Sequence, residues 1–275
     1  MATLAHTDLI AGPHPPERRV LFLHGLLGRG GNWRSFARRW VEKHPSWEAV
    51  LVDLRLHGDS RAGFSAPHSV RAAAADVLDL VQALPGPVEA LVGHSLGGKV
   101  VLAAQRASGQ RFPRAVILDA SPSARPEGLG TEQSSEVLAL LRALPRSYAN
   151  RTDFDRAMEA GGQSRAIAQW LAMWLDPAQH GFQLSLDLPG LEALFRSVLA
   201  EDDWDVVTSV PAGHRLGFVV GGRSSVVEPE ARARLAALTP RVTLEEVPDA
   251  GHWLQVDAPD ATFAAVERAL SIERS

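Results

Sequence analysis

Ser95 has the sequence context of a nucleophile. It lies in the stretch 93–97, which reads Gly-His-Ser-Leu-Gly, between an apolar run at 87–92 and a helical pattern that begins at Val100. A Gly-x-Ser-x-Gly stretch between a strand and a helix makes a turn so sharp that the serine backbone is strained, and the glycines let strand and helix approach closely. The hydroxyl then lies at the carboxyl end of the strand, beside a helix N-terminus that favours developing negative charge.

A serine hydroxyl is a poor nucleophile at its free pKa, so it needs a neighbouring base. His252, in the stretch Gly-His-Trp at 251–253, follows the last expected strand, and histidine titrates in the useful pH range. A buried carboxylate would hold this imidazole in the correct tautomer. Asp119 directly follows an expected strand, although it could also cap the next segment. Glu228 begins a helical pattern, where the helix dipole also explains an acidic residue.

The elements that would position these residues alternate between strands and helices, with Gly and Pro between them. Such alternation predicts right-handed βαβ units and a parallel sheet covered by helices on both faces. Ligands bind at the carboxyl edge of such a sheet, which is where the candidate residues follow their strands. The expected strands are 19–23, 49–52, 87–92, 115–118, 216–220 and 242–247, and the helices between and after them include 33–43, 70–84, 228–238 and 258–270.

The alternation of strands and helices breaks after Pro122. From about Thr131 to Val207 the chain reads as consecutive helices without a convincing strand, at 132–144, 153–159, 165–175 and 188–199. A helical insertion within a βα series usually caps the carboxyl ends of the strands. We therefore predict an α/β core made of residues 1–124 and 208–275, with a helical cap, or lid, at 125–207.

The composition is that of an ordinary globular enzyme. Within its 275 residues the net charge is −4 and both signs are interspersed, so no nucleic-acid partner is expected. The absence of cysteine excludes disulfides, cysteine-ligated zinc and a thiol nucleophile, and it fits a reducing compartment. The N-terminus does not resemble a signal peptide, and no apolar run approaches the roughly 18 residues of a membrane span. We expect a cytoplasmic monomer or homodimer.

The sequence resembles the α/β-hydrolase family over nearly its whole length. The resemblance rests on four motifs in family order: His-Gly-Leu-Leu-Gly at 24–28, Asp-Leu-Arg-Leu-His-Gly-Asp-Ser at 53–60, Gly-His-Ser-Leu-Gly-Gly at 93–98 and Gly-His-Trp at 251–253. It implies Ser95 as the nucleophile and His252 as the base. It also implies an oxyanion hole formed by the backbone N–H groups of Leu26 and Leu96, and loss of one such donor typically costs roughly 3–4 kcal/mol.

The acid departs from the commonest pattern of this family. That pattern places an aspartate in the loop after the strand that follows the cap, but here the loop 221–227 has serines at that point. Asp119 ends the strand after the expected elbow helix. Some small bacterial esterases and acyl-CoA thioesterases, which this chain resembles, use that position for the acid. We therefore predict Asp119 as the acid, with Glu228 as the alternative.

The resemblance implies a serine hydrolase that cleaves a small-molecule carboxylic ester or thioester through an acyl-enzyme, with no cofactor and no metal. A carbon–carbon bond hydrolase or a lactonase on the same triad is an alternative, because this fold hosts many chemistries. A non-catalytic ligand-binding protein is another. The candidate pocket residues are His24, Trp33, His94, Trp170, Trp174 and Trp253. For Trp170 and Trp174, simple packing is the competing interpretation.

Three histidines and one lysine in or beside these motifs also have structural interpretations. His24, His57 and His94 lack zinc-ligand spacing with an acidic partner, so we predict that they form hydrogen bonds to the backbone of their loops. Lys99 follows two glycines, but the spacing is not that of a phosphate-binding loop. We expect Lys99 on the surface of its helix.

Overall fold

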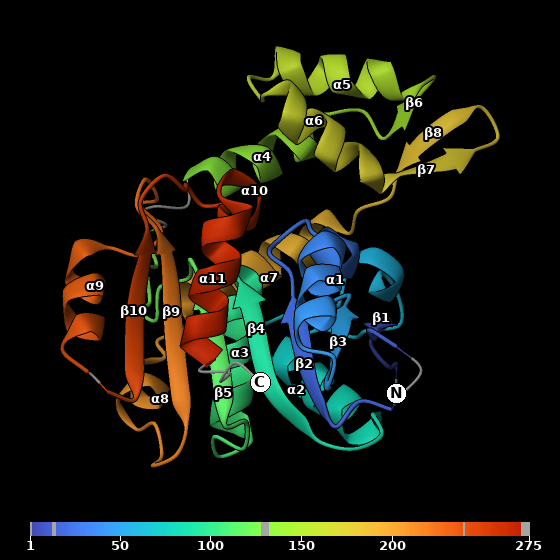
Figure 1. Ribbon diagram of the computed structural model, residues 1–275. Helices are drawn as coiled ribbons and strands as arrows, with labels where there is room; N and C mark the ends of the chain where they lie inside the picture. The colour runs from blue at the N-terminus through green and yellow to red at the C-terminus, as the bar shows by residue number, and fades with distance from the viewer. Residues whose placement is uncertain (1, 13–14, 128–131, 239, 271–275) are drawn as a thin grey trace. The chain divides into compact units, whose positions relative to one another are not determined.

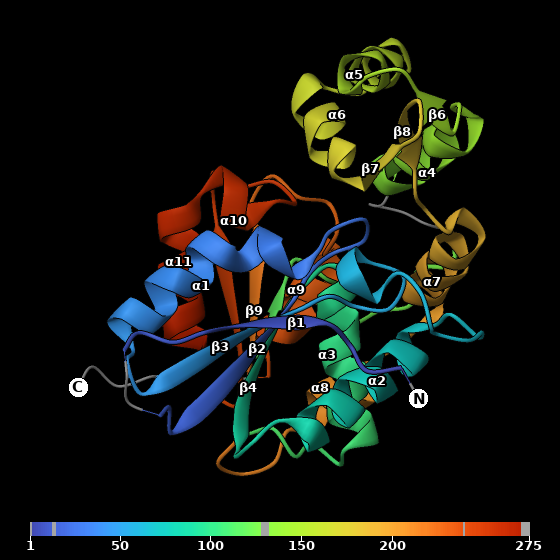
Figure 2. The same ribbon diagram turned by 90° about the vertical axis from the view of Figure 1, so that its right-hand side faces the viewer.

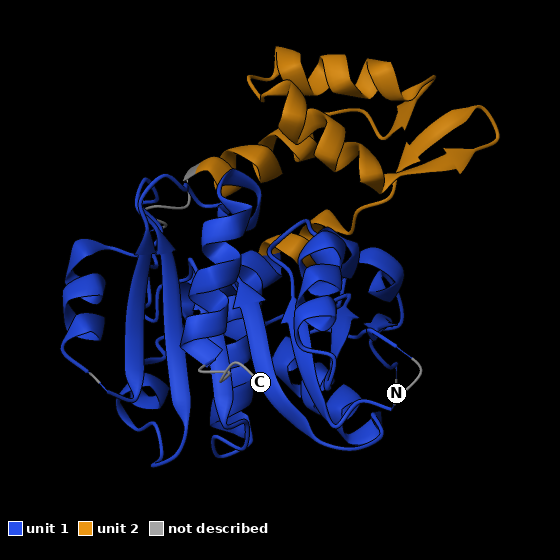
Figure 3. Cartoon of the chain, in the orientation of Figure 1, with its two compact units in different colours: residues 1–130, 193–275 blue, residues 131–192 orange. Residues whose placement is uncertain are grey.

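The computed structural model describes residues 2–12, 15–127, 132–238 and 240–270. The chain forms two compact units, Met1–Gly130 with Ala193–Ser275 and Thr131–Glu192 (Figure 3). The smaller unit is shorter than the predicted 125–207 insertion. The segment 193–207 contributes instead to the core of the larger unit, where Leu194, Val198 and Val207 are buried.

The larger unit is built on a seven-stranded sheet in the order β1-β3-β2-β4-β5-β9-β10 (Figure 1). Every neighbouring pair is parallel except β1–β3. The sheet confirms the predicted α/β class, and β1 is an additional edge strand. The strands are β1 His6–Leu9, β2 Arg18–Leu23, β3 Trp47–Val52, β4 Val88–His94, β5 Arg114–Leu118, β9 Arg215–Gly221 and β10 Val242–Val247.

Helices cover both faces of this sheet, because alternate strand residues point to opposite sides. On β2, for example, Val20 and Phe22 join one core while Leu21 and Leu23 join the other. The first core contains residues of α1 Arg34–Lys43, α10 Leu254–Asp257 and α11 Pro259–Leu270. The second contains residues of α2 Val70–Ala83, α3 Leu96–Ala107, α7 Leu188–Ala200, α8 Trp204–Thr208 and α9 Pro229–Ala236 (Figure 2).

The register of the sheet determines where the loops emerge. His94 pairs with Leu118, and Leu118 pairs with Val219. The residues that follow β4, β5 and β9 therefore leave the sheet at the same carboxyl edge. The strand order also reverses between β2 and β4, which is the kind of position where open parallel sheets bind ligands.

The smaller unit contains a sheet that the all-helical prediction missed. Its order is β6-β8-β7, and both pairings are antiparallel. The strands are too short to show an alternating pattern, and the β7–β8 turn depends on Gly181 at a φ of +94°. The elements are α4 Glu132–Ala143, β6 Ser147–Tyr148, α5 Arg151–Ala160, α6 Arg165–Leu171, the 3₁₀ turn Ala172–Trp174, β7 Leu175–Ala178, β8 Gly181–Leu184 and the first residues of α7. None of the helices described has both the length and the apolar character needed to cross a membrane.

Candidate active site

Ser95 occupies the sharp turn between β4 and α3. Its backbone is strained, with φ +53° and ψ −116°. The turn requires glycine on either side. A Cβ on Gly93 would lie 2.2 Å from the Gly97 carbonyl oxygen, and a Cβ on Gly97 would lie 2.4 Å from the carbonyl oxygen of Leu23. Strand and helix therefore approach each other as the sequence pattern predicts, and the serine is held at the tip.

Three of the predicted residues form one hydrogen-bonded chain. His252 Nε2 lies 3.1 Å from the Ser95 hydroxyl oxygen, and His252 Nδ1 lies 2.7 Å from Asp119 Oδ2. Asp119 is fully buried, whereas His252 keeps part of its side chain exposed. This is the geometry of a nucleophile, a base and an orienting carboxylate. An imidazole placed in this way can accept the serine proton while the carboxylate stabilises the resulting cation.

The Asp119 carboxylate accepts three hydrogen bonds, two from the segment 221–224 at the end of β9 and one from His252. Oδ1 accepts the backbone N–H of Gly221 at 3.0 Å, and Oδ2 accepts the Ser224 hydroxyl as well as His252 Nδ1. The Asp119 backbone is itself strained, at φ +46°. The sequence did not predict a role for Ser224, although Ser224 lies in the serine-containing loop 221–227 that was considered for the acid.

Glu228, the alternative acid, lies elsewhere in the larger unit. Burial tends to raise the pKa of its carboxyl, but hydrogen bonds from Ser123, from its own backbone N–H and from Ser121, together with the charge of Arg125, hold the pKa below its usual value. Glu228 immediately precedes α9, as its helix-start pattern predicted. The structure therefore places Asp119, and not Glu228, against His252.

The loops after β2 and β3 are joined by two buried histidines. The N–H of Leu54 donates to His24 Nε2 at 3.1 Å, and the N–H of Leu27 donates to His57 Nε2 at 3.1 Å. Each Nε2 must therefore be an unprotonated acceptor, so Nδ1 carries the proton and donates to the carbonyl oxygen of Gly25 or Arg55. Burial lowers the pKa of His24 to about 4 and that of His57 to about 3. Both rings are neutral at pH 7.

His94, directly before the nucleophile, is likewise a buried histidine that forms a hydrogen bond to backbone. Its Nε2 donates to the backbone carbonyl of His252 at 2.7 Å, and its ring lies 4.7 Å from the His252 ring. Burial lowers the pKa of His94 to about 3. These contacts confirm that His24, His57 and His94 form hydrogen bonds to backbone. They also show that His24 and His94, two candidate pocket residues, are nearly fully buried.

The four candidate pocket tryptophans occupy different environments. Trp33 is 1% exposed and packs on Phe22 and Phe36 in the core of the larger unit. Trp253 is half-buried, with its ring 6.1 Å from that of His252. Trp170 and Trp174 belong to the smaller unit, where Trp174 is buried and Trp170 is half-buried. Of the two candidates in the larger unit, Trp253 is the one placed next to the triad.

The loop after β2 brings backbone donors close to Ser95. A Cβ on Gly25 would lie 3.3 Å from Ser95 Cβ, so this loop passes in contact with the nucleophile. Leu26 follows directly in the loop, and Leu96 is the first residue of α3. Within the described part of the chain, neither of their N–H groups has a hydrogen-bond partner. In the same residues, no group of three His, Cys, Asp or Glu side chains is arranged to bind a metal ion.

Comparisons with known proteins agree with the α/β fold described above. The chain is similar to the sn-1-specific diacylglycerol lipase ABHD11 of Mus musculus, with 28% identity over 260 residues that cover 90% of this chain and 79% of that protein. It is similar to the esterase YbfF of Escherichia coli strain K12, with 26% identity over 254 residues, 92% of each protein. Among solved structures, a marine microorganism esterase shares the fold with a TM-score of 0.81 at 20% identity, covering 98% of this chain and 99% of that one. A family model described as "Alpha/beta hydrolase family" matches residues 20–266, and the chain belongs to that family.

Proposed function

We propose that this protein is a serine hydrolase that cleaves small-molecule carboxylic esters or thioesters through an acyl-enzyme. The observation that carries the proposal is the continuous hydrogen-bonded chain from Ser95 through His252 to the buried Asp119. The esterase and lipase relatives support the substrate class.

In the proposed mechanism, His252 Nε2 removes the Ser95 proton as the hydroxyl oxygen attacks the acyl carbon. Asp119 holds the Nδ1 proton and stabilises the imidazolium. The oxyanion of the tetrahedral intermediate binds to the N–H groups of Leu26 and Leu96. His252 then protonates the departing alcohol or thiol, and a water activated by the same nitrogen hydrolyses the acyl-enzyme.

We further propose that the insertion between β5 and β9 acts as a cap that selects the acyl group. Its position within the βα series supports this role, as does its own packed core, which includes Phe154, Met158 and Leu171. Trp170 is the aromatic candidate for substrate contact because it is half-buried, whereas Trp174 is buried. Replacement of Trp170 by alanine should shift the preferred acyl length without reducing the labelling of Ser95 by a small fluorophosphonate.

The direct test is hydrolysis of p-nitrophenyl esters from acetate to palmitate, together with the matching acyl thioesters, by the wild type and by Ser95→Ala. We expect turnover by the wild type and none by the variant. A fluorophosphonate probe should label the wild type at Ser95 and leave the variant unlabelled. Labelling without turnover of any of these open-chain esters or thioesters would favour the carbon–carbon bond hydrolase or the lactonase. A folded wild type that takes no label would favour a ligand-binding protein.

A further inference from the structure

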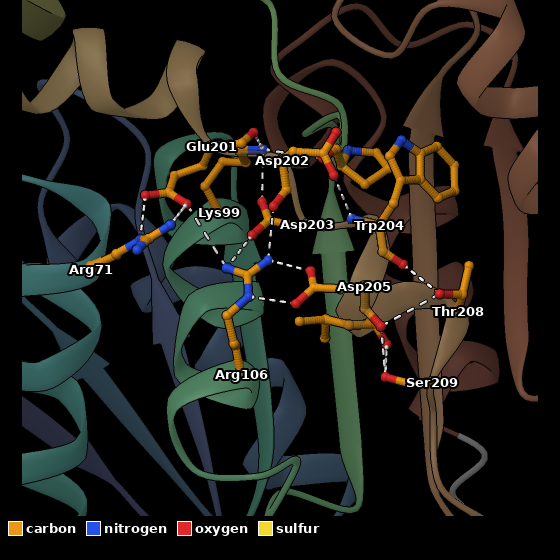
Figure 4. A network of polar contacts seen from close by, with 12 residues as sticks. Arg71, Lys99, Arg106, Glu201, Asp202, Asp203, Trp204, Asp205, Thr208 and Ser209 are labelled. Atoms are coloured by element: carbon orange, nitrogen blue, oxygen red, sulfur yellow. Dashed lines mark hydrogen bonds and ion pairs between the residues drawn. The ribbon is translucent and has the colours of Figure 1, made fainter.

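Lys99 is buried, which contradicts its expected position on the helix surface. It is 2% exposed and lies on α3, four residues after Ser95. Figure 4 shows it within a network of charged side chains that connects α3 with the segment 201–205. A buried ammonium needs a specific set of partners, because the removal of an uncompensated ion from water is unfavourable.

The Lys99 side chain binds the chain segment that follows the acid. Its Nζ donates to the carbonyl oxygen of Ser121 at 3.1 Å and approaches that of Pro122 at 3.5 Å. It also donates to the Glu201 carbonyl oxygen and pairs with Asp203 Oδ2, both at 2.7 Å. The three protons of the ammonium are thus directed to groups on two separate segments.

The backbone of Lys99 contacts the turn that carries the nucleophile. Its N–H donates to the carbonyl oxygen of Ser95 at 3.2 Å. One residue therefore contacts Ser95 through its backbone and the chain after Asp119 through its side chain. Ser95 and Asp119 both have positive φ, at +53° and +46°. Such strained residues keep their conformation only where the surrounding structure holds them.

The counter-ion of Lys99 is fixed from several sides. Asp203 is fully buried, pairs with Arg106 at 2.9 Å through Oδ1, and donates its N–H to the carbonyl oxygen of Pro122 at 2.8 Å. Arg106 also pairs with Asp205. Asp203 therefore holds the Lys99 ammonium in place and binds the same post-acid segment directly.

We propose that Lys99 is a positioning residue for the hydrolytic reaction. It fixes the segment after Asp119 against the helix that follows Ser95, and thereby sets the separation of acid and nucleophile that His252 must span. The expected effect on the rate of hydrolysis rests on the proposed function. The expected effect on the Asp119–His252 hydrogen bond can be measured without a known substrate.

The test compares Lys99→Met with the double variant Lys99→Met/Asp203→Asn. The single variant leaves the Asp203 carboxylate with less compensation, so lost activity could reflect lost stability. The double variant removes this charge as well. Arg71→Gln is the matched control, because it removes a cation from the exposed rim of the same network, where Arg71 pairs with Glu201. All activities are expressed per folded molecule, with the folded fraction measured by circular dichroism.

In the double variant, kcat and kcat/KM should fall together by at least about tenfold, since a small displacement of catalytic groups is costly. Arg71→Gln should keep both constants. A double variant with wild-type constants per folded molecule would overturn the inference and leave Lys99 a purely structural residue.

A second readout is the downfield proton NMR resonance of His252 Nδ1–H, which depends on the Asp119 carboxylate and is referenced to Asp119→Asn. We expect it in the wild type and expect it to be shifted or broadened in the double variant. An unchanged resonance in the double variant, or none in the wild type, would overturn the inference. Because this signal needs no substrate, a wild type that shows the resonance but hydrolyses no ester would count against the proposed function alone.

Discussion

At the scale of single residues, the Asp119 carboxylate determines how His252 faces the nucleophile. A neutral imidazole can place its proton on either nitrogen, and a carboxylate at Nδ1 selects the tautomer that leaves Nε2 free to accept the serine proton. The backbone N–H of Gly221 and the Ser224 hydroxyl hold this carboxylate in turn. The orientation of the base therefore depends on residues that follow β5 and on residues at the end of β9.

Asp119→Asn should lower kcat by about three to four orders of magnitude, because an amide NH₂ at this position stabilises the wrong imidazole tautomer. Glu228→Gln should leave kcat essentially unchanged, since Glu228 is bound to Ser121 and Ser123 and not to His252. Steady-state kinetics on one ester substrate measures both. The opposite result, with Glu228→Gln inactive and Asp119→Asn active, would reassign the acid.

Ser224→Ala should lower kcat/KM by about tenfold, because the hydrogen bond it removes is made to an ionised carboxylate. Ser225→Ala is the matched control, since the neighbouring Ser225 is exposed. Equal effects of the two substitutions would show that the loop as a whole, and not the Ser224 hydroxyl, matters to the reaction.

At the scale of elements, the carboxyl ends of the strands could be predicted, but the contacts between loops could not. Glycine spacing and apolar runs placed Ser95, Asp119 and His252 after their strands, and parallel pairing brings those ends together. Ser224 and Lys99 were beyond prediction for a different reason. A serine in a loop or a lysine on a helix is usually a surface residue unless contacts with residues distant in sequence bury it. The local sequence pattern does not identify those distant residues.

His57, which joins the loops after β2 and β3, should make the free energy of unfolding depend on pH. Burial lowers the folded-state pKa of His57 from its ordinary value of 6.5 to about 3. As pH falls below 6.5, the unfolded chain binds a proton that the folded chain does not. His57 thus makes unfolding easier by about 1.4 kcal/mol for each pH unit between about 6 and 4. The stabilisation is complete above pH 6.5 and is lost as the pH falls.

His57→Gln should therefore reduce the slope of unfolding free energy against pH by about 1.4 kcal/mol per unit in this window, although it lowers stability at pH 7. Urea unfolding at pH 7, 6, 5 and 4.5 measures the slope. The contribution of the carboxylates is common to both proteins and cancels in the comparison. An unchanged slope would mean that His57 is protonated in the folded state.

At the scale of the whole molecule, the point at which the βα series is interrupted was predictable, whereas the internal structure of the insertion was not. In the sequence, the alternation of strand and helix patterns gives way after β5 to consecutive helical patterns. Within the insertion, β7 and β8 are four residues each, and a strand of that length has no periodicity that distinguishes it from a loop. The boundary also depends on packing, since α7 begins in one compact unit and ends in the other.

Because each unit has its own buried core, we expect a core defect in one to weaken that unit first. Phe154 is fully buried in the smaller unit and Phe263 is 1% exposed in the larger. Truncation of either to alanine should cost about 3–5 kcal/mol. Hydrogen exchange should show reduced protection in α5 and α6 for Phe154→Ala, with β2, β4 and β5 still protected as in the wild type. Phe263→Ala should instead reduce protection of those strands. If Phe154→Ala lost as much protection in β2, β4 and β5 as in α5, the two units would unfold as a single cooperative structure.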